Sequence, residues 1–197
     1  LKQTRRRPAV LLSYPGVKSP PPGEARTVRL RPAPGPSGEI GVAVVGPGSF
    51  MKGVFLPVLR RQPGARLLSV VAATGGSALS AAERFGAATA STHMEKVLSD
   101  PAVGLVLIGT RHHLHAEQVV RSLEAGKAVF VEKPLCLTRE ELESIRAACS
   151  PNTLVTDVAS TKASICGYAR DAWRGAPWFV GSHPMAGSEQ KGVAYAR

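Results

Sequence analysis

The chain has 197 residues, of which 44% are hydrophobic and 20% charged, a composition typical of one sizeable soluble domain. No apolar run reaches the ~18 residues that a membrane-spanning helix needs, so we expect no membrane span. The formal net charge is +11, but residues 1–38 hold eight basic residues and one acid and therefore carry +7 of it. Because the surplus lies mostly in that segment and no known nucleic-acid-binding motif accompanies it, we expect no nucleic-acid partner.

The amino-terminal segment has the composition of a linker. Residues 1–38 contain eight of the 16 prolines, and proline-rich chains favour extended conformations without packing. We therefore expect a basic tail that forms no packed element. The chain starts at Leu1 and not at Met, which indicates a fragment or a processed protein. No signal peptide is visible.

The cysteines bear on location and metal binding. Cys136, Cys149 and Cys166 are odd in number, and their spacing matches no metal site. Free thiols are typical of the reducing cytoplasm. We therefore expect a cytoplasmic protein with three free thiols and no bound metal.

From residue 39 onward, short apolar runs alternate with helical patterns. Strands are expected at 40–45, 67–73, 103–108, 128–131, 154–158 and 178–180, and helices at 55–61, 77–85, 94–98, 115–124, 138–149 and 162–173. The helix at 138–149 has a capping box, because Glu141 lies three residues after the cap candidate Thr138. Strands rich in Val, Ile and Leu that alternate with helices indicate an α/β fold, a Rossmann-type doubly wound parallel sheet covered on both faces.

A glycine-containing turn follows the first expected strand directly. Gly46-Pro47-Gly48 opens a helix, with Ser49 and Phe50 next in the chain and Met51 at the third position of the dinucleotide fingerprint. One glycine allows the sharp turn, and another lets the backbone approach a pyrophosphate, which the helix N-terminus then binds. The position between a buried strand and a helix predicts coenzyme binding by residues 46–50.

The end of the second expected strand bears on the choice between NAD and NADP. Residues 72–77 read Ala-Ala-Thr-Gly-Gly-Ser, with no acid to hold a ribose 2′-hydroxyl and no arginine. Without an acid, a 2′-phosphate is not repelled. We therefore expect coenzyme contact at Thr74 and tolerance of NADP as well as NAD.

Four polar clusters follow later strands, and the carboxyl ends of parallel strands meet at one edge of a sheet. The clusters are residues 110–115, 132–134, 159–162 and 182–189. They predict one site, with Thr110, His112, His115, Glu132 and Lys133 at the coenzyme. For His112 and His113 the alternative is a solvated loop, and for His115 a plain position in the first turn of its helix. Imidazole suits proton transfer near neutral pH, which makes His183 a candidate acid or base.

Residues 39–149 resemble the nucleotide-binding domain of the Gfo/Idh/MocA oxidoreductases. The matching stretches are Gly46-Pro47-Gly48, Leu56-Pro57, Ala82–Gly86, Leu114-His115, Glu124–Lys127 and Val131-Glu132-Lys133-Pro134-Leu135. The resemblance implies that Lys133 is a catalytic residue in contact with substrate and nicotinamide. The second, α+β domain of that family has no counterpart in this sequence, and we expect a homodimer only where such a domain is present.

Residues 150–197 instead resemble prephenate dehydrogenase and are expected to continue the Rossmann sheet. The matching stretches are residues 154–162 and 179–189, followed by Gly192-Val193. This resemblance implies that His183 binds the hydroxyl of prephenate and accepts its proton, that Ser160 orients His183, and that Ser188 and Glu189 contact the substrate.

Three functions follow as hypotheses. The leading one is an NAD(P)-binding oxidoreductase domain of Gfo/Idh/MocA type that transfers hydride between nicotinamide and a small hydroxyl-bearing substrate. The first alternative is a prephenate or arogenate dehydrogenase, which acts by oxidative decarboxylation in tyrosine synthesis. The second alternative is a truncated nucleotide-binding module without turnover.

Overall fold

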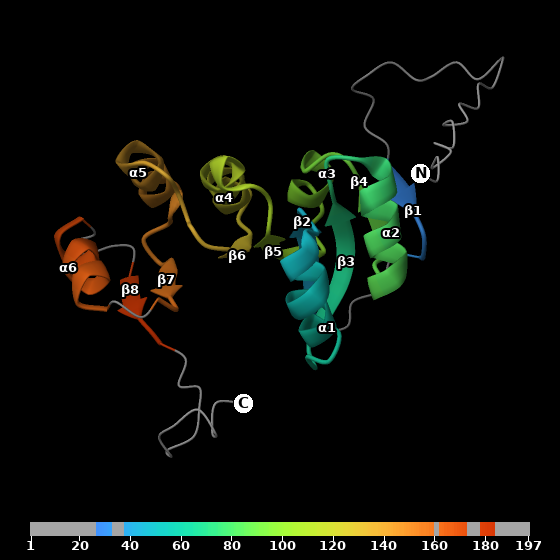
Figure 1. The fold of residues 1–197 in the computed structure, drawn as a ribbon, viewed down its shortest axis with the longest axis horizontal. Helices are drawn as coiled ribbons and strands as arrows, with labels where there is room; N and C mark the ends of the chain where they lie inside the picture. The colour runs from blue at the N-terminus through green and yellow to red at the C-terminus, as the bar shows by residue number, and fades with distance from the viewer. Residues whose placement is uncertain (1–26, 33–37, 160–161, 173–177, 184–197) are drawn as a thin grey trace, which may run out of the picture.

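The computed structural model describes residues 27–32, 38–159, 162–172 and 178–183 of the chain. Figure 1 shows the order of the elements from blue to red. They are β1 (Thr27–Arg29), β2 (Ile40–Val45), a π-helical turn (Met51–Phe55) that runs into α1 (Leu56–Leu59), β3 (Ala65–Val71), α2 (Gly75–Phe85), β4 (Thr89–Ser91), α3 (Glu95–Leu98), β5 (Val103–Ile108), a 3₁₀ turn (His112–Leu114), α4 (His115–Glu124), β6 (Ala128–Val131), α5 (Arg139–Ala148), β7 (Leu154–Asp157), α6 (Lys162–Ala172) and β8 (Trp178–Gly181).

In the described part of the chain, the main sheet has six strands in the order β1-β4-β3-β2-β5-β6. Strand β2 pairs in parallel with β3 on one side and with β5 on the other, and β5 pairs in parallel with β6. The crossovers therefore run outward from β2 in both directions, which is the doubly wound arrangement expected from the alternation of strands and helices. The carboxyl ends of β3, β2, β5 and β6 consequently follow one another along a single edge.

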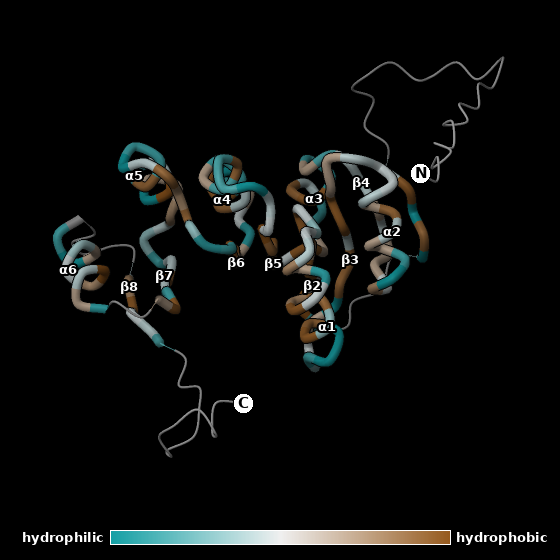
Figure 2. Tube along the Cα trace, in the orientation of Figure 1, coloured by the Kyte–Doolittle hydropathy of each residue, from teal (hydrophilic) through white to brown (hydrophobic). Residues whose placement is uncertain are grey.

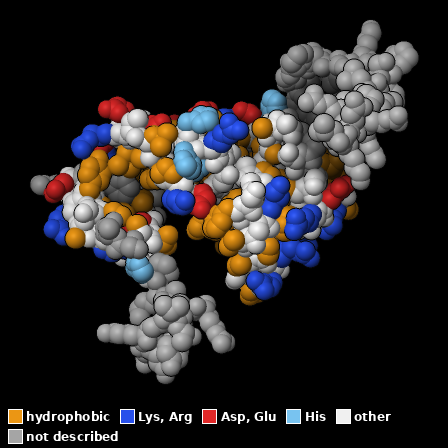
Figure 3. Space-filling view, viewed as in Figure 1, with side chains coloured by type: hydrophobic (Ala, Val, Ile, Leu, Met, Phe, Trp, Pro, Cys, Tyr) orange, Lys and Arg blue, Asp and Glu red, His pale blue; other side chains and the backbone are white. Residues whose placement is uncertain are grey.

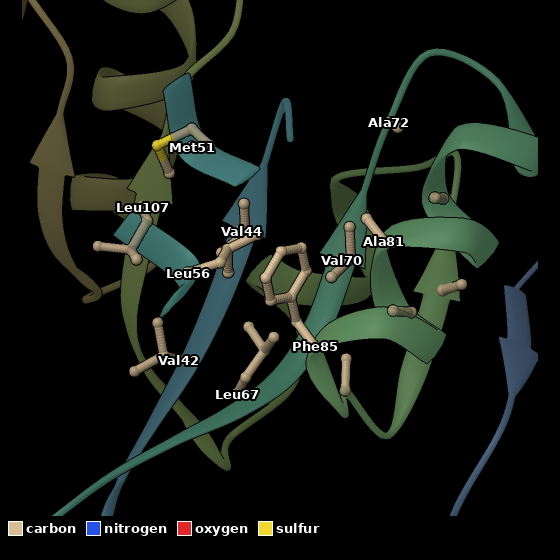
Figure 4. Close-up of a cluster of buried hydrophobic side chains, with 14 residues drawn as sticks. Val42, Val44, Met51, Leu56, Leu67, Val70, Ala72, Ala81, Phe85 and Leu107 are labelled. Carbon is tan, nitrogen blue, oxygen red and sulfur yellow. The ribbon is translucent and has the colours of Figure 1, made fainter. Parts of the chain in front are cut away.

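The two faces of the sheet bury two separate hydrophobic cores. Val42 and Val44 of β2 point to one face, where the segment from the π-helical turn to α1 and helix α2 pack, as Figure 4 shows. Ala43 and Val45 point to the other face, where residues of α3, α4 and α5 cover them. Side chains alternate across a strand, so a continuous apolar run is what a strand covered on both faces requires. Figure 2 shows the same division, with hydrophobic central strands and largely hydrophilic outer surfaces on α4 and α5.

Most of the expected elements are confirmed. The bounds of β2, β5, α4 and β6 agree with the expected ranges 40–45, 103–108, 115–124 and 128–131. The capping box at α5 is present, with the Thr138 hydroxyl accepting from the Glu141 amide at 3.2 Å and the Glu141 carboxylate accepting from the Thr138 amide at 3.3 Å. These features depend on neighbours within a few residues, which a local pattern specifies.

The expectation that residues 1–38 form no packed element is wrong for residues 27–30. Strand β1 pairs antiparallel with β4, the Leu30 amide donates to the Ala88 carbonyl, and the Leu30 side chain packs against the core. Strand β4 would otherwise present unpaired N–H and C=O groups at the sheet edge, and β1 satisfies them. The rest of the expected tail, residues 1–26 and 33–37, lies outside the described residues.

The expectation that residues 150–197 continue the main sheet is also wrong for the strands that the structure describes. Strands β7 and β8 pair in parallel with each other in a separate two-stranded sheet, which lies at the far end from β3 in Figure 1. A strand added beside β6 would be covered on both faces, yet Leu154 is 65% exposed and Trp178 is 67% exposed. Helix α5 instead ends the compact body by packing Ile145 into the core shared with α4.

Candidate functional site

The turn after β2 brings two backbone segments into close contact. Gly46 has φ 80°, a backbone conformation that residues with a side chain rarely adopt. A β-carbon at Gly46 would lie 2.5 Å from Thr110 Cγ2 and 2.7 Å from the Thr110 backbone. The Gly46 amide donates to the Val71 carbonyl at 2.9 Å. Gly46 is therefore needed where the loops after β2 and β5 meet.

Gly48 differs from Gly46 because it faces open space. The nearest atom to a β-carbon at Gly48 would be the Gly109 carbonyl oxygen at 3.7 Å, an ordinary contact. Gly48, Ser49 and Phe50 are exposed, whereas Pro47 is buried. The exposed residues begin a helical segment that continues to Leu59, and the first N–H groups of a helix lack intrahelical partners. This arrangement fits a pyrophosphate group.

The end of β3 offers hydroxyl groups and no charge. Thr74 caps α2, its hydroxyl oxygen accepting from the Ser77 amide at 3.3 Å and its hydroxyl donating to Ser77 Oγ at 3.0 Å. Residues 73–77 are all exposed. The absence of a carboxylate from this corner, noted in the sequence, therefore leaves an accessible, uncharged surface beside the glycine turn.

The loop after β5 holds one histidine inside the protein and two outside it. His112 and His113 are exposed, and the His112 ring lies 5.7 Å from the ring of His115. His115 is 0% exposed. Its Nδ1 lies 2.7 Å from the Pro134 carbonyl oxygen and its Nε2 3.1 Å from the Thr110 carbonyl oxygen. We expected a coenzyme contact from His115, but burial and two backbone partners leave its ring no free polar atom.

The loop after β6 presents Lys133 at the same edge. The Lys133 side chain is exposed, its amide donates to Glu132 Oε2 at 2.8 Å, and the Lys133-Pro134 peptide bond is cis. On the face shown in Figure 3, histidine, basic and acidic side chains gather over β6 and α4. Lys133 is thus a cation held by a short loop next to the end of β5.

The four polar clusters expected at one edge do not all lie together. Residues 110–115 and 132–134 follow β5 and β6 of the main sheet, whereas the described residues of the other two clusters, 159, 162, 182 and 183, follow β7 and β8 of the separate sheet. His183 is exposed. The interpretation as a single site is wrong because β7 does not pair with β6. Ser160, Ser188 and Glu189 lie outside the described residues.

Sequence reasoning missed two residues that organise this edge. The Thr110 hydroxyl donates to Gln118 Oε1 at 2.7 Å, which ties the loop after β5 to helix α4. Gly109 packs under Met51, since a β-carbon there would lie 2.4 Å from Met51 Cγ. A glycine that follows a strand directly is a signal of close approach, and it could have identified Gly109. No local signal identifies Gln118.

The fold and this edge define the class. A doubly wound parallel sheet with a glycine turn and helix N-terminus after its central strand is a dinucleotide-binding Rossmann domain. The profile of the Gfo/Idh/MocA family, described as "Oxidoreductase family, NAD-binding Rossmann fold", matches residues 40–159. The chain belongs to this family.

Similarity to individual proteins is confined to part of each. The chain is 38% identical over 82 residues to levoglucosan dehydrogenase of Pseudarthrobacter phenanthrenivorans, which is 42% of this chain and 21% of the relative. It is 38% identical over 79 residues to the NAD⁺-dependent scyllo-inositol 2-dehydrogenase of Bacillus subtilis, which is 40% of this chain and 23% of the relative. The chain therefore spans less than a quarter of the length of either relative.

Solved structures give the same fold together with bound coenzymes. The 3-ketoreductase KijD10 of Actinomadura kijaniata, in complex with NADP, is similar with a TM-score of 0.53 and 30% identity over 56% of this chain and 35% of that chain. GenD2 from gentamicin A biosynthesis, in complex with NAD, is similar with a TM-score of 0.52 and 35% identity over 59% of this chain and 34% of that chain. NAD or NADP is accordingly the coenzyme of the family.

The comparisons give no support to the resemblance between residues 150–197 and prephenate dehydrogenase.

In the described part of the chain, no helix is long and apolar enough to cross a membrane. Cys136, Cys149 and Cys166 are all free thiols. Among the same described residues, no cluster of three or more His, Cys, Asp or Glu side chains could hold a metal ion.

Proposed function

We propose that this chain is the coenzyme-binding part of an oxidoreductase that transfers hydride between NAD or NADP and a hydroxyl or keto carbon of a sugar or polyol. One observation carries the proposal. The ends of β3, β2, β5 and β6 lie in that order along one edge, and they bring Thr74, the glycine turn, Thr110 and Lys133 into a row. The order of these positions along the edge corresponds to the order of the parts of a dinucleotide, from the adenosine ribose through the pyrophosphate to the nicotinamide.

Each position in the row has a proposed role. Thr74 would contact the adenosine ribose, and the backbone at Gly46, Gly48, Ser49 and Phe50 would bind the pyrophosphate. Thr110 and His112, after β5, and Glu132, after β6, would line the nicotinamide end. The bound nicotinamide supplies or accepts the hydride.

Lys133 is the proposed catalytic residue. It is exposed at the end of β6, and its ammonium group can donate a hydrogen bond to a substrate oxygen and stabilise charge that develops there. In the oxidative direction the same group would accept a proton from the substrate hydroxyl once deprotonated. Its place beside the end of β5 puts it near the proposed nicotinamide end of the row.

The substrate class rests on the relatives. Levoglucosan and scyllo-inositol appear in the names of two proteins that this chain resembles, and a third is named as a 3-ketoreductase. We propose that the substrate is small and polyhydroxylated. The proposal also includes a cytoplasmic location and excludes a nucleic-acid partner. Prephenate oxidation does not, because no comparison supports it. A homodimer is proposed only for a chain that also carries the second domain.

Coenzyme titration tests the proposal. The intrinsic fluorescence change of NADH and NADPH would be followed as the 197-residue chain is added, for the wild type and for Lys133→Met. Lys127→Met is the matched control. Lys127 directly precedes β6, at the opposite end of the strand from Lys133, and its ammonium group donates to the Asp100 carbonyl at 2.8 Å. We expect saturable binding to the wild type and the control. No saturable binding of either coenzyme to the wild type would contradict the proposal.

A second assay separates turnover from binding alone. Coenzyme reduction would be measured with a panel of sugars and polyols and with prephenate. Reduction that depends on a sugar and is lost in Lys133→Met supports the full proposal. Binding without reduction on any substrate supports a nucleotide-binding module without turnover, and reduction that depends on prephenate would contradict the proposed substrate class.

A further inference from the structure

We infer that His115 is a positioning residue that holds the Lys133 loop in place through the Pro134 carbonyl. The inference rests on the proposed function of the same site. The His115 ring lies between two loops that are distant in the sequence, the loop after β5 at Thr110 and the loop after β6 at Pro134. Lys133 is the residue immediately before Pro134, so the position of its backbone depends on where that carbonyl is held.

Burial makes these two contacts consequential. His115 is 0% exposed, and water cannot take the place of either partner. A buried polar group left without a partner costs about 1–3 kcal/mol, so the ring nitrogen that carries hydrogen must donate it to one of these neighbours. Both neighbouring atoms are carbonyl oxygens, which can only accept hydrogen bonds. A ring nitrogen must carry hydrogen to bond to one of them.

The two contacts are not equivalent. The Nδ1 contact with Pro134 is 2.7 Å and the Nε2 contact with Thr110 is 3.1 Å. Thr110 has other ties, since its hydroxyl bonds to Gln118 and its backbone lies against Gly46. Among the described residues, the Pro134 carbonyl has no hydrogen-bond partner other than His115 Nδ1, and Lys133 is exposed. The bond from Nδ1 is therefore the one that positions Lys133.

Two substitutions separate the bonds. The side-chain amide nitrogen of asparagine lies close to the place of Nδ1, and that of glutamine close to the place of Nε2. His115→Asn therefore keeps a donor toward Pro134, and His115→Gln keeps one toward Thr110. Ser122→Ala is the control, because Ser122 is also fully buried on α4 but its hydroxyl donates to the Gln118 carbonyl, at 2.7 Å.

The variants would be compared by NADPH dissociation constant and by thermal unfolding midpoint. We expect His115→Gln to weaken NADPH binding by about tenfold, as loss of about 1.4 kcal/mol would do, and His115→Asn to stay close to wild type. Ser122→Ala should lower the midpoint without changing affinity. Affinity that follows the midpoint across all three variants, or an equal loss in Asn and Gln, would overturn the inference while leaving coenzyme binding intact.

Two further measurements keep the inference testable where a variant does not fold. Long-range ¹H–¹⁵N correlation on the wild type should show hydrogen on Nδ1 of His115, and an Nδ1 without hydrogen would overturn the inference. The ¹³Cε signal of Lys133, assigned with Lys133→Arg, should move in His115→Gln and not in Ser122→Ala. Wild type that binds neither coenzyme would overturn the proposed function, whereas the Nδ1 result would still decide the bond.

Discussion

The Met51 side chain occupies the space directly over Gly109. A β-carbon on Gly109 would lie 2.4 Å from Met51 Cγ and 2.9 Å from its Sδ, closer than such atoms can approach. Met51 stands at the third position of the glycine fingerprint, where a small residue normally lets helix and strand pack closely. Here the small residue is Gly109, directly after β5, and Met51 is 2% exposed. Close packing is therefore kept, with the bulky and the small partner exchanged.

Replacement of Gly109 by a larger residue should destabilise the domain. Gly109→Ala is expected to lower the free energy of unfolding by about 1–3 kcal/mol, the usual cost of overpacking, and Met51→Ala in the same chain should recover part of the loss. Denaturant unfolding measures both. Gly104→Ala on β5 is the control, since its β-carbon would meet nothing nearer than 3.6 Å. Equal effects at 104 and 109 would contradict the packing argument.

The two glycines of the turn should respond differently to substitution. Gly48→Val is expected to leave the unfolding midpoint nearly unchanged, because the space beside Gly48 is open, and to weaken coenzyme binding by at least about tenfold, or 1.4 kcal/mol. Gly46→Ala should instead destabilise the fold, because its φ is 80° and Thr110 is too close. Unchanged coenzyme affinity in Gly48→Val would remove the pyrophosphate from this turn.

An acid at the end of β3 should create discrimination between coenzymes. Ala73 is exposed beside the cap residue Thr74, and Ala73→Asp would place a carboxylate near a 2′-phosphate. At about 4 Å two like charges repel by about 1 kcal/mol in water and about 4 kcal/mol near a protein surface. We expect NADPH to lose affinity by about fivefold or more, with a smaller change for NADH. Parallel titrations measure the ratio, and an unchanged ratio would place the ribose elsewhere.

Two thiols should react slowly at neutral pH. Burial raises the pKa of Cys136, with a further contribution from the charge of Glu141, and burial raises the pKa of Cys149. Because the thiolate is the reactive form, iodoacetamide should modify both more slowly in the folded chain than in the same chain unfolded in urea. The difference should narrow as pH rises through the raised values. Mass spectrometry of the peptides gives each rate, and equal rates at neutral pH would contradict the shifts.

Local pattern was sufficient for much of the fold. Strand β2 was predictable because a six-residue apolar run must be covered on both faces. The Thr138–Glu141 capping box and the glycine turn at 46–48 were predictable because their partners lie within a few residues. Each is a short-range signal that any compatible fold preserves.

Other features depend on partners far away in the chain. Strand β1 forms because β4, some sixty residues later, has a free edge, as in the contact between Thr27 and Ser91 at 2.9 Å. Strands β7 and β8 look in sequence like further strands of the main sheet, but pairing is settled by which edges meet, and they pair with each other.

The amino-acid sequence by itself determined the family, the alternation of strands and helices and the place of the glycine turn, because each resides in residue types at short spacing. Only the tertiary structure decided that His115 is buried between Thr110 and Pro134 and that Met51 lies over Gly109. Both contacts join segments that adjacent strands bring together, and no local preference of His115 or Met51 specifies such a partner.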